Sequence, residues 1–399
     1  MKKLLSLVLI LSLLLCGCYK APVHVPSDPA PVPETHFSPK PPEDIPEVAA
    51  PVFTQQPMLA VSTPATTEYF SDEEGSILFS HTYQTMQLTT QDPEVADKII
   101  IDFLARMDQS HIQAQLLHQQ ALSSATPDAP YALSTLYSPM RIDQNVLSLY
   151  GATMSYSGGI HPDHNCTGAS YSMLTGDVLT LGGILTDVNA LTALCELVLT
   201  ELGNNKDIYQ LIGGYEAVVK ERLLSNESYN EDWYFSPSGL CILFPPYEIA
   251  PYASGVISVE IPYENLSGII ADDFFPPETE YPVGDISVVR WNDAEIENFN
   301  QIAEITIDED GEAFLLYTEN TVYDVRLEVG SWSPYGDSFF PEYTAFASRS
   351  LTPGDAIIAR AYFPDVLPAM RLVYKCGAET KYFFLAQSGK DGSIYLSDQ

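Results

Sequence analysis

The arrangement of helical and extended segments after about residue 68 constrains the fold of this 399-residue chain more than any other feature. The extended segments are short and apolar, and helices lie between them without the strict strand–helix alternation of a parallel sheet. This pattern predicts an α+β domain with a mixed, largely antiparallel sheet and helices on one face. The extended segments are 76–88, two runs within 131–159, 169–181, a strand pair within 233–244, and 256–263.

Two of the helical segments have a clear apolar face. The first is expected to begin with Asp92 as its N-cap and Pro93 as its first residue. Its buried face would contain Val95, Ile99, Phe103 and Met107, which recur every fourth position. The second helical segment surrounds Cys195. This cysteine shares one helical face with Leu191, Leu194, Val198 and Leu202.

The sequence changes character from residue 281 onward, where short strand patterns are separated by turns. Residues 321–329 alternate, with Tyr323, Val325, Leu327 and Val329 on one face and Asp324, Arg326 and Glu328 on the other. Further strands are expected at 355–363, 369–376, 380–387 and 392–398. This spacing predicts an all-β sandwich, immunoglobulin-like, over 281–399, a fold that more often adheres than catalyses. Fold alone does not establish that role.

The N-terminus has the features of a bacterial lipoprotein signal. Two lysines precede an apolar run from Leu4 to Leu15, and the small residue Gly17 precedes Cys18. The run is shorter than the roughly 20 residues of a membrane-spanning helix. We therefore expect a signal peptide over 1–17, a lipid on Cys18, and a protein anchored on the outer face of the bacterial cytoplasmic membrane, exposed to the cell wall.

A proline-rich segment follows the expected lipidation site. It contains too many prolines for helix or sheet and too few large apolar residues to pack. We assign 18–66 to the lipidated cysteine and an extended linker, 67–280 to the α+β domain, and 281–399 to the sandwich.

Acidic residues dominate the charge of the chain. It has 53 Asp and Glu against 18 Lys and Arg, a net charge of −35. Such a chain is repelled by nucleic acid and by anionic lipid headgroups, so we expect no nucleic-acid partner and contact with the membrane only through the anchor. Basic proteins and cations would be attracted, although the same charge also serves solubility.

Four cysteines remain beyond the signal region: Cys166, Cys195, Cys241 and Cys376. An even number in an exported protein permits disulfides. Cys195 and Cys241 lie in apolar segments, however, and are expected to behave as small buried hydrophobic residues. Whether the four are free or paired stays open.

Three short motifs occur in order in the middle of the chain. Gly158, Gly159 and His161 form a Gly-Gly-x-His turn, and Thr175 with Gly176 opens a Thr-Gly-x-x-Leu-Thr-Leu segment. The third motif, Tyr-x-Ile-x-Pro-Tyr-x-x-Gly, consists of Tyr247, Ile249, Pro251, Tyr252 and Gly255. Over about residues 68–272 these motifs resemble the extracellular domain of the lysozyme-binding anti-sigma factors of the RsiV type, a module also found in PdaC-type peptidoglycan deacetylases.

The resemblance implies a domain that binds an envelope-associated ligand, such as lysozyme or another basic wall-active protein. The chain departs from both families, because it has a lipoprotein signal in place of a sigma-binding segment and shows no deacetylase motif. We therefore expect a non-catalytic surface lipoprotein that needs no cofactor. A peptidoglycan-modifying enzyme with an unrecognised site is the alternative.

The turn around residue 161 also raises the question of a metal. His161, His164 and Cys166 provide three candidate ligands, whereas a closed site usually needs four. We therefore expect no metal, although a metal-capturing surface protein is a further alternative. A hairpin turn explains these residues better: it would contain Gly158 and Gly159, and the imidazole of His161 would be hydrogen-bonded to the backbone. Tyr247, Pro251 and Tyr252 are candidates for a recognition groove or a packed corner.

Overall fold

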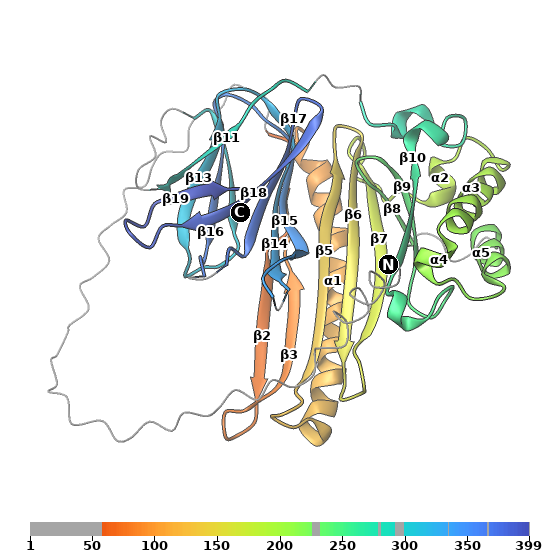
Figure 1. Cartoon of the computed structure of the whole chain (residues 1–399), viewed down its shortest axis with the longest axis horizontal. Coiled ribbons are helices and arrows are strands. Elements are labelled where there is room, and N and C mark those ends of the chain that lie inside the picture. The colour runs from red at the N-terminus through yellow and green to blue at the C-terminus, as the bar shows by residue number, and fades with distance from the viewer. Residues whose placement is uncertain are drawn as a thin grey trace, which may run out of the picture. The chain divides into compact units, whose positions relative to one another are not determined.

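The computed structural model describes residues 58–225, 232–277, 281–291, 299–333, 335–364 and 367–398. Within these ranges the chain is an α+β protein with 19 strands in several largely antiparallel sheets and five α-helices (Figure 1). The expected fold class is therefore confirmed. No helix in these ranges is both long enough and apolar enough to cross a membrane. The signal peptide, Cys18 and most of the expected linker lie outside the described residues.

The first layer is a five-stranded sheet covered on one face by the long helix α1 (Figure 1). In spatial order its strands are β2 (Ala65–Ser71), β3 (Ile77–Gln84), β5 (Tyr131–Ile142), β6 (Val146–Tyr156) and β7 (Asp163–Ser172). All neighbours are antiparallel except β3 and β5. Helix α1 spans Pro93–Ser124, and Asp92 caps it by accepting from the backbone N–H of Glu94. Its expected apolar face is confirmed as buried.

The second layer packs on the opposite face of the five-stranded sheet. It is a three-stranded sheet in the order β10 (Ile257–Pro262), β9 (Gly239–Phe244) and β8 (Trp233–Phe235). One apolar core joins it to the helices α2 (Leu181–Ile184), α3 (Ala190–Asn204) and α5 (Tyr215–Leu224), with the short α4 (Lys206–Tyr209) beside them. Three 3-10 helices complete this region: η1 (Tyr252–Ser254), η2 (Tyr263–Asn265) and η3 (Asp272–Phe274).

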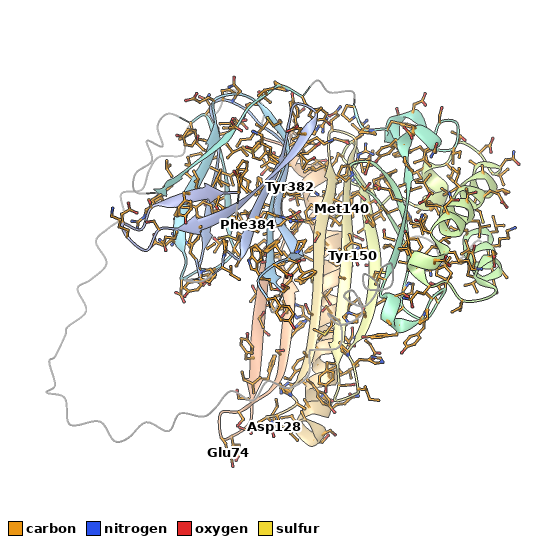
Figure 2. All side chains as sticks on the ribbon, viewed as in Figure 1. Glu74, Asp128, Met140, Tyr150, Tyr382 and Phe384 are labelled. Atoms are coloured by element: carbon orange, nitrogen blue, oxygen red, sulfur yellow. The ribbon has the colours of Figure 1, made fainter. Side chains whose placement is uncertain are left out.

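The cysteines behave as their sequence contexts predicted. Cys195 lies on α3 and packs in the apolar core beneath it, whereas Cys241 lies on β9; both side chains are buried. Cys166 and Cys376 are buried too, and all four are free thiols. Cys166 and Cys241 share a small cluster against which Met140 and Tyr150 pack. Met140 lies on β5 and Tyr150 on β6 (Figure 2). None of these four buried cysteines therefore forms a disulfide.

The C-terminal region is a β-sandwich, as the strand spacing predicted. Its core lies between two sheets. The four-stranded sheet has the order β11 (Ile286–Arg290), β13 (Glu312–Thr318), β16 (Asp355–Ala361) and β12 (Gln301–Thr306). The seven-stranded sheet has the order β19 (Ile394–Ser397), β18 (Glu379–Gln387), β17 (Met370–Cys376), β14 (Val322–Trp332), β15 (Phe339–Leu351), β1 (Ala60–Ser62) and β4 (Gln87–Thr89). Phe384 and Tyr382 lie on β18 (Figure 2).

The alternation expected along β14 is interrupted at Asp324. This residue has a φ of 51°, and the pairing register shifts between Tyr323 and Arg326. Val322, Val325 and Leu327 therefore enter the sandwich core, and Tyr323 instead contacts the ring of Tyr281. The expectation for Tyr323 was wrong because a bulge adds one residue to the strand and reverses the faces before it.

The folded part also begins earlier than the linker assignment suggested. Strand β1 lies between β4 and β15 and pairs with both, and Met58 is buried in the sandwich core. Next to it, Thr63 donates a hydrogen bond from Oγ1 to the carbonyl oxygen of Thr344 at 2.9 Å. Residues 58–66 thus belong to the folded protein, because β1 completes hydrogen bonds of strands from both ends of the chain. The described residues form one compact unit, and the boundary at residue 281 stays a prediction.

Candidate functional site

The turn between β6 and β7 places the Gly-Gly-x-His motif at the end of the five-stranded sheet. Gly158 has a φ of 84°, as the turn interpretation required, and a side chain there would begin 3.2 Å from the ring of Tyr131. Gly159 needs no positive φ. Ile160 and His161 at the tip are exposed.

A second segment, the connection from β9 to β10, contains the third motif. Ile249 is buried and anchors this connection in the core beneath the helices. Pro251 is exposed and precedes η1, with a ψ of 156° that directs Tyr252 into the 3-10 turn. Tyr247 has a φ of 72° and is 62% exposed. The connection therefore presents two tyrosines from a backbone that is fixed at Ile249.

The two motifs meet in space. The imidazole of His161 stacks on the ring of Tyr252 with centroids 3.9 Å apart and an interplanar angle of 23°. The hydroxyl of Tyr247 lies 3.3 Å from Nε2 of His161. The hydroxyl of Tyr252 donates to the carbonyl oxygen of Pro162 at 2.6 Å, and Nδ1 of His161 lies 3.0 Å from the same oxygen. The backbone hydrogen bond expected for His161 is therefore present.

We call this group the aromatic surface; it consists of Ile160, His161, His164, Tyr247 and Tyr252. The ring of Tyr247 is 5.4 Å from that of Tyr252, and His164 extends the group with a centroid 6.1 Å from Tyr252. Burial lowers the pKa of His164, and the neighbouring Asp163 only partly opposes that shift. The lowered pKa favours the neutral imidazole of His164. The surface thus combines aromatic rings with hydrogen-bonding groups.

The conformation of Tyr247 is the most unusual feature of this surface. A positive φ is rare for a residue with a bulky side chain and costs of order 1 kcal/mol or more. Packing of the side chain in the core commonly offsets such a conformational cost, but the ring of Tyr247 is mostly exposed. Strain that holds an aromatic side chain in solvent is typical of a recognition position.

The candidate metal ligands do not converge. Cys166 is buried within the cluster that contains Tyr234 and Cys241, whereas His161 and His164 are exposed. Burial raises the pKa of the Cys166 thiol to about 12, so the thiolate that would bind a metal or act as a nucleophile is not populated at neutral pH. In the described ranges no cluster of three His, Cys, Asp or Glu side chains has a geometry that would hold a metal ion.

Sequence reasoning missed two members of the aromatic surface. The sequence indicates His164 only as a candidate metal ligand, and it gives Ile160 no role. An isoleucine between a glycine pair and a histidine at a hairpin tip is a signal that could have found it, because turn tips are usually polar.

Fold and site together define an α+β protein with an exposed aromatic surface, followed by a β-sandwich. Residues 184–264 match the model of a family described as "Protein of unknown function (DUF3298)", so the chain contains a DUF3298 domain. This range includes Tyr247 and Tyr252 but not the β6–β7 turn. No curated protein matches the chain significantly.

Two solved structures of DUF3298 family proteins are similar to the chain. One is from Pseudomonas aeruginosa PAO1, with 16% identity, a TM-score of 0.36, and coverage of 55% of this chain and 98% of that one. The other is from Bacteroides fragilis NCTC 9343, with 16% identity, a TM-score of 0.41, and coverage of 55% and 96%.

Proposed function

We propose that this protein is a non-catalytic, lipid-anchored surface protein whose aromatic surface binds a basic envelope-associated protein, such as lysozyme. The observation that carries the proposal is the exposed, strained Tyr247 beside the stacked pair of His161 and Tyr252. The resemblance of the same motifs to the lysozyme-binding RsiV-type domain supports the choice of partner.

The aromatic surface has the properties of a binding hot spot. Aromatic side chains dominate the energy of protein interfaces, because each buries a large area and loses little rotamer freedom on binding. Here the rings of His161 and Tyr252 are already stacked, and Tyr252 is tied to Pro162 by a hydrogen bond. A partner would therefore meet a surface that is ordered before binding, which lowers the entropic cost of association.

The net charge supports a basic partner. A chain with a net charge of −35 attracts a cationic protein over long distances and accelerates encounter. Charge alone is unselective and is screened as the Debye length falls to about 8 Å at 0.15 M salt. The aromatic surface would supply the contact that survives screening.

The test is the affinity of the soluble chain, residues 19–399, for lysozyme by calorimetry. We expect one-to-one binding that weakens but remains measurable at 0.15 M salt. Tyr247→Ala should weaken it about 30-fold, equivalent to about 2 kcal/mol, with little effect on stability because the side chain is exposed.

Two controls make this result specific. Tyr69→Ala removes a tyrosine of similar exposure, 65%, from β2. This strand and β7 form the two opposite edges of the five-stranded sheet, so the variant should leave binding unchanged. Cytochrome c tests for attraction by charge alone. The proposal is wrong if cytochrome c and lysozyme bind alike and both are released at 0.15 M salt, or if both tyrosine variants bind as the parent does.

The membrane anchor is tested separately. If Cys18 bears the lipid, as Gly17 before it indicates, Cys18→Ala should abolish lipid labelling and maturation. Cys16→Ala is the matched control, because Cys16 follows the bulky Leu15 and should remain dispensable. Unchanged labelling of the Cys18 variant would exclude this anchor.

A further inference from the structure

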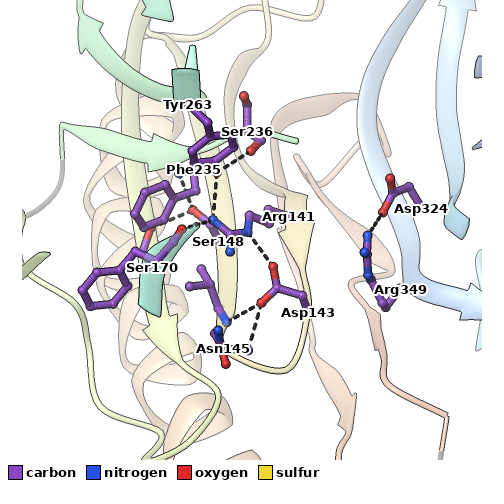
Figure 3. A network of polar contacts seen from close by, with 12 residues as sticks. Arg141, Asp143, Asn145, Ser148, Ser170, Phe235, Ser236, Tyr263, Asp324 and Arg349 are labelled. Atoms are coloured by element: carbon purple, nitrogen blue, oxygen red, sulfur yellow. Dashed lines mark hydrogen bonds and ion pairs between the residues drawn. The ribbon is translucent and has the colours of Figure 1, made fainter. Parts of the chain in front are cut away.

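A cavity of about 90 Å³ lies where the end of β5 meets strands β14 and β15 of the sandwich. Its lining includes three of the few cationic side chains of this acidic protein, and two aspartates stand among them. Figure 3 shows the pairs that these groups form on the two sides. The charged lining residues are Arg141, Arg326, Arg349, Asp143 and Asp324.

The first aspartate, Asp143, accepts hydrogen bonds through both carboxylate oxygens. Asp143 accepts from Nε of Arg141 at 2.6 Å through Oδ2. Its Oδ1 accepts from the backbone N–H groups of Asn145 and Val146 at 2.9 and 3.0 Å. Both oxygens of Asp143 therefore already accept hydrogen bonds.

The second aspartate is engaged on the sandwich side. Asp324 accepts from Nη1 of Arg349 at 2.7 Å, and its other oxygen lies 3.6 Å from Nζ of Lys375. Both carboxylates of the lining thus already interact with donors. The lining contains three guanidinium groups and only these two carboxylates.

Two guanidinium donors of the lining have no hydrogen-bond partner in the described structure. They are Nη2 of Arg141 and Nε of Arg326, and both atoms are buried. The side chain of Arg141 is only 4% exposed. Unpaired buried donors on charged groups are costly, so a site that contains two of them is incomplete without an acceptor.

We propose that this cavity binds a small oxyanion of the phosphate class. Guanidinium groups match the geometry of phosphate oxygens and are the side chains that proteins use most for planar, bidentate recognition. The volume suits one such anionic group or a few water molecules. The anion is either free phosphate or the phosphoryl end of a larger molecule.

An anion in this cavity would contact arginines from two different parts of the fold. Arg141 belongs to β5, and Arg326 and Arg349 belong to β14 and β15. An anion that bonds to both sides would connect the α+β region to the sandwich, and it would stabilise the folded chain in proportion to its occupancy.

The test compares thermal unfolding of the soluble chain in sodium phosphate and in sodium chloride of equal ionic strength at one pH. At a phosphate concentration 100 times its Kd, the Tm should rise by about 5 °C relative to chloride. Glycerol phosphate distinguishes the sources: an equal or larger rise indicates a phosphoryl end, and a smaller one indicates free phosphate.

Arg326→Met is the decisive variant, because it removes the unpaired Nε donor and keeps the apolar stem. It should weaken phosphate binding at least tenfold by calorimetry while it retains the Tm of the parent in chloride to within a few degrees. Lys220→Met removes one positive charge from helix α5, outside the cavity lining, and should bind phosphate as the parent does. Equal phosphate and chloride curves for the parent, or unchanged phosphate affinity in Arg326→Met, would overturn the proposal.

Discussion

Replacing Gly168 with alanine should destabilise the protein by at least about 3 kcal/mol, because the new methyl group has no space. Gly168 lies on β7, and a Cβ there would be 1.7 Å from the carbonyl oxygen of Trp233 on β8. The obstacle is backbone, which cannot rotate away as a side chain can. Denaturant unfolding measures the change directly.

The reason for this contact is a face of small residues on the five-stranded sheet. Ser148 and Ser170 lie on the same face, with their hydroxyls 2.7 Å apart, and Ser148 accepts a hydrogen bond from the backbone N–H of Phe235 at 2.8 Å. The backbone of β8 thus lies directly on β6 and β7. Gly168→Ala should therefore loosen the whole second layer from the sheet.

Gly182→Ala is the matched control. A Cβ at Gly182 in helix α2 meets no atom within 4 Å, and its φ is not in the left-handed region. Alanine should be neutral there or stabilise the protein by a few tenths of a kcal/mol, because it restricts the unfolded chain. Similar unfolding midpoints for both glycine variants would show that the layers separate easily and that the close contact is not required.

Arg141→Met should cost about 3–5 kcal/mol, because it leaves Asp143 as a buried charge without its cation. The two side chains are 4% and 2% exposed, and their pair distance is 2.6 Å. Nη1 of Arg141 also donates to the hydroxyl of Tyr263 at 2.8 Å and to the carbonyl oxygen of Phe274 at 2.6 Å. One side chain thus joins the end of β5 to η2 and η3.

The exposed pair of Lys220 and Glu196 provides the comparison. Its atoms are 3.5 Å apart, and both side chains are more than half exposed. Lys220→Met should change the free energy of unfolding by less than about 1 kcal/mol, since solvent already screens this pair. A loss of under 1 kcal/mol for Arg141→Met as well would mean that water reaches the buried pair and that the network does not hold the layers together.

Local patterns predicted the two longest helices, α1 and α3, and most strands. The N-cap at Asp92, the apolar face of α1 and the buried position of Cys195 follow from spacing within one or two turns. The bulge at Asp324 was not predicted, because its cause is the pairing of β14 with β15 and β17 and not the alternation of its own residues.

Three of the five members of the aromatic surface were predicted as site residues, but their arrangement was not. The motif residues His161, Tyr247 and Tyr252 were identified as separate turn and corner positions. Their contacts depend on β7 and β9, which bring two turns together so that His161 meets Tyr247, 86 residues further along the chain, and stacks on Tyr252. Periodicity contains no information about such a distance, so the aromatic surface could not be derived from it.

The sequence by itself determined the α+β and sandwich classes, the acidic charge and the turn at Gly158, because each depends on composition or on neighbours within a few residues. Only the tertiary structure decided the place of β1, which pairs with β4 and with β15 more than 280 residues away. It also decided the exposure of Tyr247 and the convergence of three arginines on one cavity. These features arise from contacts between distant segments, whose partners are selected only when the layers pack.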